Sequence, residues 1–151
     1  MERGTLVGGK YRLTRPLAEG GMGSVWVAEH TELGVDIAVK FIAEDDPSPE
    51  AYARFRREAK VAAQLRSQHV VQVLDYGVVE ARPYIAMELL QGEDLKRRLD
   101  RKGSLSLAET AQIVEQLSRA VDDAHASGLI HRDIKPRNVF LARYTRGEVV
   151  K

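Results

Sequence analysis

The spacing of apolar residues changes along the chain from a strand-like to a helix-like period, and this change divides the chain into two parts. In the first part, short runs of β-branched and aromatic residues alternate with glycine-containing turns, which is typical of antiparallel strands. Turns are expected near Gly77 and at Arg82-Pro83. The runs cover residues 11–17, 25–30, 37–42, 70–76 and 78–88. The pattern therefore predicts a five-stranded antiparallel sheet.

One helix is expected between the third and fourth of these strands. Ser48-Pro49 provides an N-cap followed by proline at the first helical position, which predicts a helix over about 49–66. Glu58 lies beside the apolar stripe of this helix, so its side chain can reach inward. The stripe consists of Phe55, Ala59, Ala62 and Ala63.

The second part of the chain is expected to be mainly helical. Asp94 can cap a short helix that ends near Gly103. Ser106 and Glu109 form an S-x-x-E capping box that opens a longer helix, which ends near Gly128. The apolar stripe of this helix consists of Leu107, Ala111, Val114, Leu117, Val121 and Ala124. A sheet followed by helices predicts the α+β class.

A polar stretch over residues 131–138 lies between short apolar runs at 129–130 and 139–141. We expect a loop held between two buried, strand-like anchors. Loops positioned in this way often display catalytic groups.

The residue types in this loop suit phosphate chemistry. Asp133 can accept the proton of a hydroxyl group, and Lys135 can neutralise a phosphoryl group during transfer. Asn138 can offer a neutral oxygen to Mg²⁺. An alternative is a polar surface turn whose Asp and Asn bond only their own backbone.

The same stretch resembles the H-R-D-x-K-x-x-N catalytic loop of protein kinases. The resemblance implies that Asp133 is the catalytic base, that Lys135 stabilises the γ-phosphate and that Asn138 is a Mg²⁺ ligand. It also implies that Arg132 holds a phosphorylated activation loop. Within the family, Lys135-Pro136 indicates serine or threonine substrates rather than tyrosine.

A second motif, residues 18–25, resembles the G-x-G-x-x-G-x-V phosphate-covering loop of kinases. Ala18 stands where the family has its first glycine, whereas Gly20 and Gly23 keep the positions nearest the phosphates. A plain hairpin turn is the alternative. The nucleotide-binding positions implied here are Leu17, Ala18, Gly20, Gly21, Gly23 and Val25.

The next strand, Ile37-Ala38-Val39-Lys40, resembles the kinase V-A-I-K strand. The resemblance implies that Ala38 lines the nucleotide site and that Lys40 binds the α and β phosphates, with Glu58 as its ion-pair partner. Alternatively, Lys40 is a strand-end lysine that extends to solvent, and Glu58 is an ordinary surface residue.

The segment Met87-Glu88-Leu89-Leu90 resembles the hinge between the two kinase lobes. The resemblance implies that Met87 is the gatekeeper and that the backbone at Glu88 and Leu90 hydrogen-bonds adenine. Glu93 or Asp94 could contact ribose, although helix capping is the better-supported role for Asp94.

Composition supports a globular protein without a nucleic-acid partner. The chain has 151 residues, 44% of them apolar, and a net charge of +1 with acidic and basic residues interspersed. It contains no cysteine, which excludes disulfides and thiolate metal sites. No apolar run approaches the roughly 20 residues of a membrane helix, and residues 1–10 have no signal-peptide core. We expect a cytoplasmic protein.

Together the motifs resemble a bacterial-type serine/threonine protein kinase. The resemblance implies ATP and Mg²⁺ as cofactors and a protein substrate, with no membrane segment in this chain. A leader at 1–10 would precede the small lobe at 11–88, the hinge at 89–92 and the first part of the large lobe at 93–151. In the family a D-F-G motif follows, so we expect an N-terminal portion that is inactive alone. The alternative is a catalytically silent kinase-like module that binds nucleotide or a partner.

Overall fold

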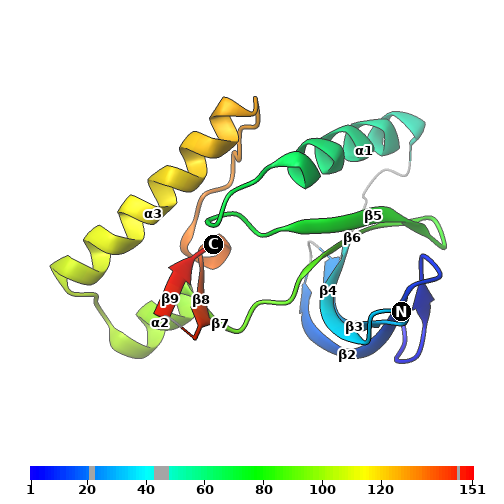
Figure 1. Ribbon diagram of the computed structural model, residues 1–151, viewed down its shortest axis with the longest axis horizontal. Coiled ribbons are helices and arrows are strands. Elements are labelled where there is room, and N and C mark those ends of the chain that lie inside the picture. The colour runs from blue at the N-terminus through cyan, green and yellow to red at the C-terminus, as the bar shows by residue number, and fades with distance from the viewer. Residues whose placement is uncertain (21–22, 43–47, 146) are drawn as a thin grey trace. The chain divides into compact units, whose positions relative to one another are not determined.

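The computed structural model describes residues 1–20, 23–42, 48–145 and 147–151. These residues form two compact units (Figure 1). The first unit consists of residues 1–64 and 72–89, and the second consists of residues 65–71 and 90–151. The second unit is therefore built from two separate segments of the chain.

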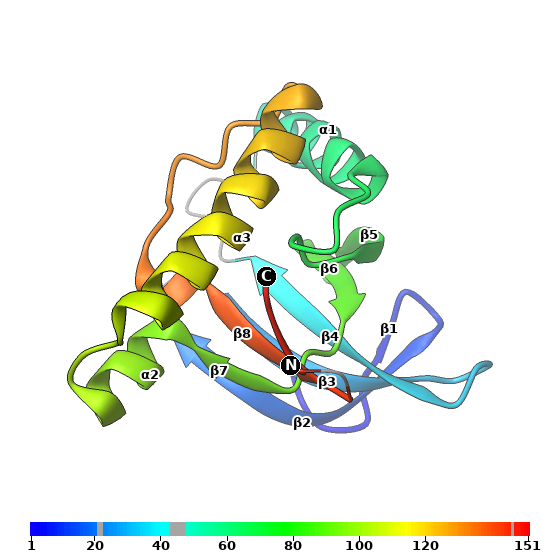
Figure 2. The same ribbon diagram turned by 60° about the vertical axis from the view of Figure 1, so that its left-hand side comes forward.

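The first unit contains an antiparallel sheet whose strands follow the order β1-β2-β3-β4-β6-β5. One helix, α1 (Pro49–Gln64), packs against β5 (Figures 1 and 2). The helix begins where Ser48 Oγ accepts a hydrogen bond of 3.2 Å from the Ala51 backbone N–H, as the sequence predicts. The strands are β1 (Leu6–Val7), β2 (Tyr11–Gly20), β3 (Gly23–His30), β4 (Val35–Ile42), β5 (Val73–Val79) and β6 (Arg82–Glu88).

The sheet differs from the prediction at its first strand and at one turn. Leu6–Val7 pairs with β2, so the described sheet has six strands and part of the expected leader belongs to it. The expected turn near Gly77 is wrong, and the turn expected at Arg82-Pro83 lies two residues earlier, at Glu80-Ala81, where both residues have positive φ. Gly77 lies inside β5 and pairs with Tyr84 of β6. A Cβ at this position would lie 2.8 Å from the Tyr84 hydroxyl oxygen. This glycine provides room for an aromatic ring instead of a turn.

The core of the first unit lies on the sheet face that carries Tyr11, Val39 and Tyr84, all of which are buried. The Tyr11 hydroxyl donates a 3.0 Å hydrogen bond to Asp75 Oδ2, which also accepts one of 3.0 Å from Lys10 Nζ. Burial, together with the nearby Asp75, raises the pKa of the Tyr11 hydroxyl. These contacts join the start of β2 to β5, which lies at the far edge of the sheet.

The second unit has two helices and a small antiparallel sheet in the order β7-β8-β9. Asp94 Oδ1 caps the first helix by accepting from the Arg97 backbone N–H at 2.9 Å, and Gly103 ends it with φ +78°. Both helices therefore begin and end close to the predicted residues. The elements are β7 (Gly92–Asp94), α2 (Leu95–Lys102), α3 (Leu107–Ala126), a 3-10 turn η1 (Pro136–Asn138), β8 (Phe140–Tyr144) and β9 (Gly147–Val150).

The buried face of α3 is only partly the predicted stripe. Ala120 and Ala124 are buried, and Leu117 packs with Ile113 against the small sheet. Leu107 and Val114, which the stripe included, are 87% and 54% exposed. The packing of Ile113 and Leu117 against β8 and β9 determines which side of α3 is buried. Apolar side chains in the first turns of the helix therefore remain on the surface.

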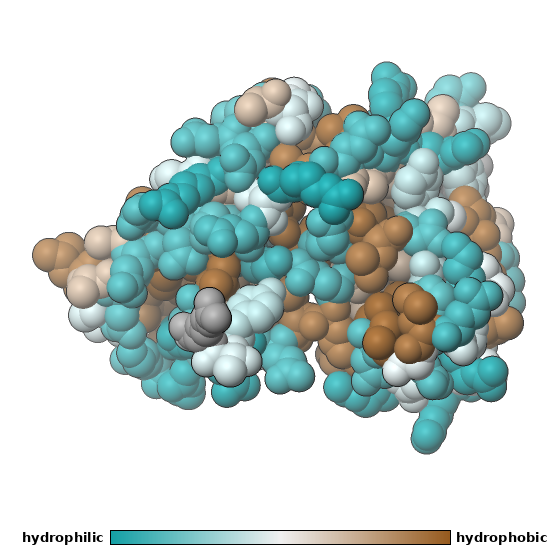
Figure 3. All heavy atoms as spheres, in the orientation of Figure 1, coloured by the Kyte–Doolittle hydropathy of each residue, from teal (hydrophilic) through white to brown (hydrophobic). Residues whose placement is uncertain are grey.

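The visible surface in Figure 3 is a mosaic of hydrophilic and apolar residues.

The two anchors expected on either side of the polar loop differ in burial. Ile130 is 64% exposed and lies in irregular backbone, so the expected strand-like anchor before the polar loop is wrong. On the other side of the loop, Val139 and Leu141 are buried as predicted. The loop is thus anchored firmly at its C-terminal side.

His69 fixes residues 65–71 to the second unit. Its side chain is 5% exposed, and its Nδ1 lies 3.1 Å from the backbone oxygen of Val150 in β9. Its Nε2 lies 3.0 Å from Gln68 Nε2, an arrangement in which Nδ1 donates to Val150 and Nε2 accepts from Gln68. Both ring nitrogens of this buried histidine are therefore hydrogen-bonded.

The capping box of α3 gives a testable pKa. Ser106 Oγ accepts from the Glu109 N–H at 3.2 Å, and Glu109 Oε2 accepts from the Ser106 N–H at 3.0 Å. Lys102 Nζ lies 2.5 Å from Glu109 Oε1. The hydrogen bond from Lys102, followed by those from Ser106, lowers the pKa of Glu109 to about 2.

Replacing Lys102 with Met should raise the pKa of Glu109 toward 4.5, its ordinary value, in an NMR titration of the side-chain carboxyl. The pKa in the folded state is lowered, so the stabilisation by the carboxylate is present above pH 4.5 and is lost as pH falls toward 2. The matched control is Lys96→Met, because Lys96 pairs with Asp100 instead. An unchanged Glu109 pKa in the Lys102 variant would contradict this assignment.

Candidate active site

The predicted catalytic loop brings its three reactive side chains together. Lys135 Nζ lies 2.8 Å from Asp133 Oδ2. Asn138 Nδ2 donates 2.9 Å hydrogen bonds to both Oδ2 and the backbone oxygen of Asp133. The spacing of residues 133, 135 and 138 thus produces one cluster within the second unit.

The backbone of the loop explains this convergence. Arg132 has φ +60°, a left-handed conformation that costs a residue with a side chain about 1–2 kcal/mol. The Asp133 backbone N–H donates to His131 Nδ1 at 3.3 Å, and the Asn138 N–H donates to the Lys135 oxygen at 2.8 Å as it closes η1. The turn at Arg132 and the 3-10 turn together direct Asp133 and Asn138 toward each other. Backbone strain of this kind is concentrated at functional sites.

Electrostatics keep Asp133 in the form that accepts a proton. The hydrogen bond from Lys135 is the main cause that lowers the pKa of Asp133, and the hydrogen bond from Asn138 acts in the same direction. The carboxylate is half-exposed, at 51%, so it is accessible from solvent. A simple surface turn would explain the Asn138 bond to the Asp133 backbone, but the contacts to the carboxylate itself go beyond it.

Several predicted nucleotide-binding residues are neighbours across the first unit's sheet. Ala18 pairs with Val25, and Val25 pairs with Lys40 on the next strand. Ala38 pairs with Met87, the predicted gatekeeper. Four strands thus place these five residues side by side.

Their exposure fits a surface that can receive a ligand. Lys40 is exposed at the end of its strand, and Leu17 is 41% exposed, whereas Ala38 is buried. Gly23 pairs with Gly20 at the tip of the β2–β3 hairpin and has φ +115°, which favours glycine. Gly21 lies outside the described residues.

The expected ion pair between Lys40 and Glu58 is not formed in the part of the chain that the structure describes. Glu58 is exposed, whereas the adjacent Ala59 is buried, so α1 presents its alanine toward the sheet. The Phe55 ring packs edge-on against Tyr76 of β5, with 6.3 Å between ring centroids. The apolar contacts of Phe55 and Ala59 therefore decide which face of α1 is buried, and Glu58 lies outside that face.

The hinge residues divide between the two units. The Glu88 backbone N–H donates to the Gln72 oxygen at 3.1 Å, and Glu88 Oε1 accepts from the Gln72 N–H at 2.8 Å. The N–H of Glu88 is therefore hydrogen-bonded within the first unit. Leu90 belongs to the second unit.

A group of ion pairs in the second unit was not predicted from the sequence. Glu93 bonds Arg98 and Arg101, and Arg98 also bonds Glu148, which lies fifty positions further along the chain. Asp94 caps α2, the role favoured for it. Pairs so distant in sequence follow from the fold and could not be found from spacing.

The described residues show neither a preformed metal cluster nor a membrane helix. No group of three or more histidine and carboxylate side chains among them is arranged to hold a metal ion. Within the same described ranges, no helix combines the length and apolar character needed to cross a membrane.

Comparison with known proteins supports the resemblance seen in the motifs. The family model described as "Protein kinase domain" matches residues 11–151. The serine/threonine-protein kinase PknH of Mycobacterium tuberculosis is 42% identical over 136 residues, which are 89% of this chain and 22% of PknH. PknA, from the same organism, is 42% identical over 144 residues, which are 91% of this chain and 33% of PknA.

A solved structure agrees. The crystal structure of the Mycobacterium tuberculosis PknI kinase domain has a TM-score of 0.86 and 31% identity, and the match covers 99% of this chain and 60% of that one. This chain thus spans between about a fifth and a third of the two curated relatives. The predicted kinase-like α+β fold is confirmed. The chain belongs to the protein kinase family, with bacterial serine/threonine-protein kinases among its relatives.

Proposed function

We propose that this chain supplies the nucleotide-binding sheet and the catalytic loop of a serine/threonine protein kinase. Such an enzyme transfers the γ-phosphate of ATP to serine or threonine hydroxyls of proteins. The observation that carries the proposal is the cluster of Asp133, Lys135 and Asn138, in which a carboxylate, a cation and an amide meet within hydrogen-bond distance.

Asp133 is the proton acceptor in this proposal. As the substrate hydroxyl oxygen bonds to the γ-phosphorus, its proton passes to Asp133 Oδ1, because Oδ2 already accepts from Lys135 and Asn138. The bond between the γ-phosphorus and the bridging oxygen of ATP breaks to release ADP. Lys135, 2.8 Å from the carboxylate, supplies positive charge where the transferring group carries negative charge. Positioning and charge stabilisation account for most of the catalysis in this type of reaction.

The residues present fit a Mg²⁺ ion. Both hydrogen bonds from the Asn138 side chain leave through Nδ2, so the remaining amide atom, Oδ1, is an oxygen that it can offer to the cation. When bound, Mg²⁺ neutralises charge on the phosphates. Asn138 would thus be one of its protein ligands.

The nucleotide is assigned to the first unit. In the proposal, Lys40 pairs with the phosphates, and Gly20 and Gly23 approach them through backbone N–H groups. Apolar contacts to the base come from the surface formed by Leu17, Ala18, Val25, Ala38 and Met87. The strand register that aligns Val25, Lys40, Ala38 and Met87 supports this assignment.

The test is a transfer assay on the complete protein that the gene encodes. The protein is incubated with γ-labelled ATP, Mg²⁺ and an acceptor protein, and the labelled amino acids are identified after hydrolysis. We expect labelled phosphoserine and phosphothreonine. The contrary result is measurable binding of Mg²⁺-ATP without labelling of any acceptor or of the protein itself. That result would support the silent nucleotide-binding module. The absence, among the described residues, of an ion pair between Lys40 and Glu58 is compatible with such a module.

A further inference from the structure

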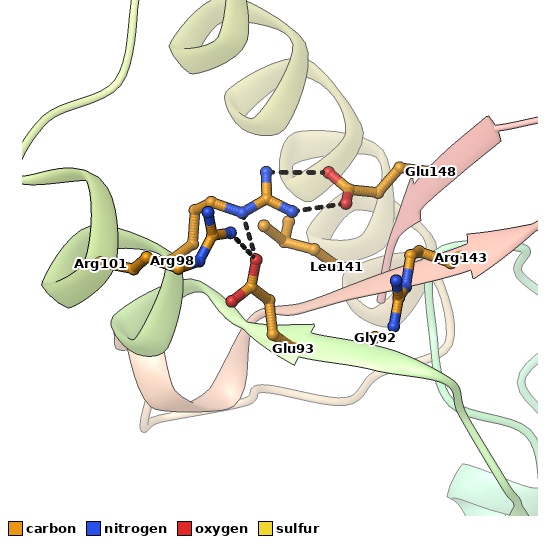
Figure 4. A pocket seen from close by; sticks show the side chains of 7 residues that line it. All are labelled: Gly92, Glu93, Arg98, Arg101, Leu141, Arg143 and Glu148. Atoms are coloured by element: carbon orange, nitrogen blue, oxygen red, sulfur yellow. Dashed lines mark hydrogen bonds and ion pairs between the residues drawn. The ribbon is translucent and has the colours of Figure 1, made fainter.

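A polar pocket of about 410 Å³ lies in the second unit between α2 and the small sheet (Figure 4). Its lining comes from β7, α2, β8 and β9, and none of the lining residues belongs to the catalytic loop. The residues that line it are Gly92, Glu93, Arg98, Arg101, Leu141, Arg143 and Glu148. Pockets of this size are in the range of ligand sites.

Four of the charged residues neutralise one another. Arg98 Nε lies 2.5 Å from Glu93 Oε1, and Arg98 Nη2 lies 2.6 Å from Glu148 Oε2. Glu93 Oε1 also accepts from Arg101 Nη2 at 2.5 Å. The Arg98 side chain is only 15% exposed, so its two carboxylate partners hold it in place as a wall of the pocket.

Arg143 is the charged residue of the pocket that does not take part in these ion pairs. Its partner across the β8–β9 ladder is Glu148, but the Glu148 carboxylate bonds Arg98. Within the ranges that the structure describes, the Arg143 guanidinium forms no ion pair and no side-chain hydrogen bond, and Figure 4 shows it apart from the Glu93–Arg98–Glu148 group. Its five donors are therefore available to a ligand in the pocket.

The charge of the pocket indicates which anion it would accept. Three arginines and two glutamates line it, which leaves one positive charge. One carboxylate would balance that charge and match the planar fork of a guanidinium. A phosphate dianion would leave an excess negative charge beside Glu93 and Glu148. The volume exceeds that of a single carboxylate group, so it also accommodates the backbone that carries one.

We propose that this pocket binds the side-chain carboxylate of an acidic residue on a partner protein, with Arg143 as the residue that recognises it. The site is distinct from the catalytic loop, so the proposal does not depend on phosphate transfer. It assigns to the β8–β9 hairpin and α2 a role in binding a protein ligand with an exposed Asp or Glu.

The probe is an acetylated and amidated hexapeptide that contains adjacent Asp and Glu residues, titrated into the ¹⁵N-labelled protein. We expect the Arg143 side-chain Nε–H resonance to shift on binding. The Arg143→Gln variant should bind at least about tenfold more weakly, because it loses hydrogen bonds between charged groups. Arg143→Lys should give an intermediate loss, because lysine keeps the charge and loses the bidentate geometry. Thermal unfolding confirms that both variants are folded.

The matched control is Arg119→Gln, which removes an exposed arginine of α3 that pairs with Glu115 and is expected to leave peptide affinity unchanged. The proposal would be overturned if Arg143→Gln and the unaltered protein bound the peptide with equal affinity. It would also be overturned if a peptide with Asn and Gln in place of the acidic residues bound equally well. Displacement of the peptide by inorganic phosphate at equal concentration would overturn it too, because that result would indicate a general anion site.

Discussion

Replacing Asp133 with Asn is expected to lower the rate of phosphate transfer by about 10²–10⁴-fold, because that is the usual contribution of a positioned general base. The amide oxygen of the new residue can still accept hydrogen bonds from Lys135 and Asn138, so the loop keeps the contacts that hold it. The amide cannot accept the substrate proton at neutral pH. The measurement is the initial rate with γ-labelled ATP for the complete protein.

Two further measurements make this result specific. Asp122→Asn changes an exposed aspartate of α3 and should leave the rate unchanged. The affinity for Mg²⁺-ATP, measured by fluorescence of a labelled nucleotide, should change little in the Asp133 variant, because Asp133 is not among the residues proposed to contact the nucleotide or Mg²⁺. A rate within threefold of the unaltered protein would exclude Asp133 as the base.

Replacing Gly92 with Ala is expected to destabilise the second unit by about 2–6 kcal/mol. Gly92 has φ +144°, a conformation that costs other residues about 1–3 kcal/mol. A Cβ at this position would also lie 2.0 Å from the backbone oxygen of Leu141, and relieving such an overlap costs about another 1–3 kcal/mol. The oxygen belongs to the strand that pairs with β7, so it can move only if the ladder shifts. Urea unfolding monitored by circular dichroism measures the loss.

Gly103→Ala separates the two causes. Gly103 also has positive φ, +78°, but a Cβ there would meet no atom within 4 Å. The free energy of unfolding of Gly103→Ala should therefore fall by about 1–2 kcal/mol, which is the cost of the left-handed backbone conformation alone. Equal losses in the two variants would show that the contact with Leu141 contributes nothing.

Local signals in the sequence predicted the helices well because caps act over three or four residues. Ser48, Asp94 and the Ser106–Glu109 box all begin helices where the sequence places them. The catalytic cluster was predictable for the same reason, since Asp133, Lys135 and Asn138 lie within six positions of one another. Such short-range hydrogen bonds depend little on the rest of the fold.

The errors involve contacts between residues that are distant in sequence. Gly77 was assigned to a turn because glycine often forms one, but it gives room to the Tyr84 ring. The register of α3 depends on Leu141 and Val150, which follow the helix in sequence. Glu58 was expected to reach Lys40, but the packing of Phe55 against Tyr76 sets the face of α1. Composition and periodicity do not contain this information.

The hydrogen bond between His69 and Val150 has a consequence for synthesis on the ribosome. The two residues are separated by 81 positions, so at about 5–20 residues per second His69 emerges roughly 4–16 s before its acceptor is made. The last strand of the first unit ends at Glu88, much earlier. The nascent chain can therefore complete its first unit while residues 65–71 still wait, unpaired, for β9.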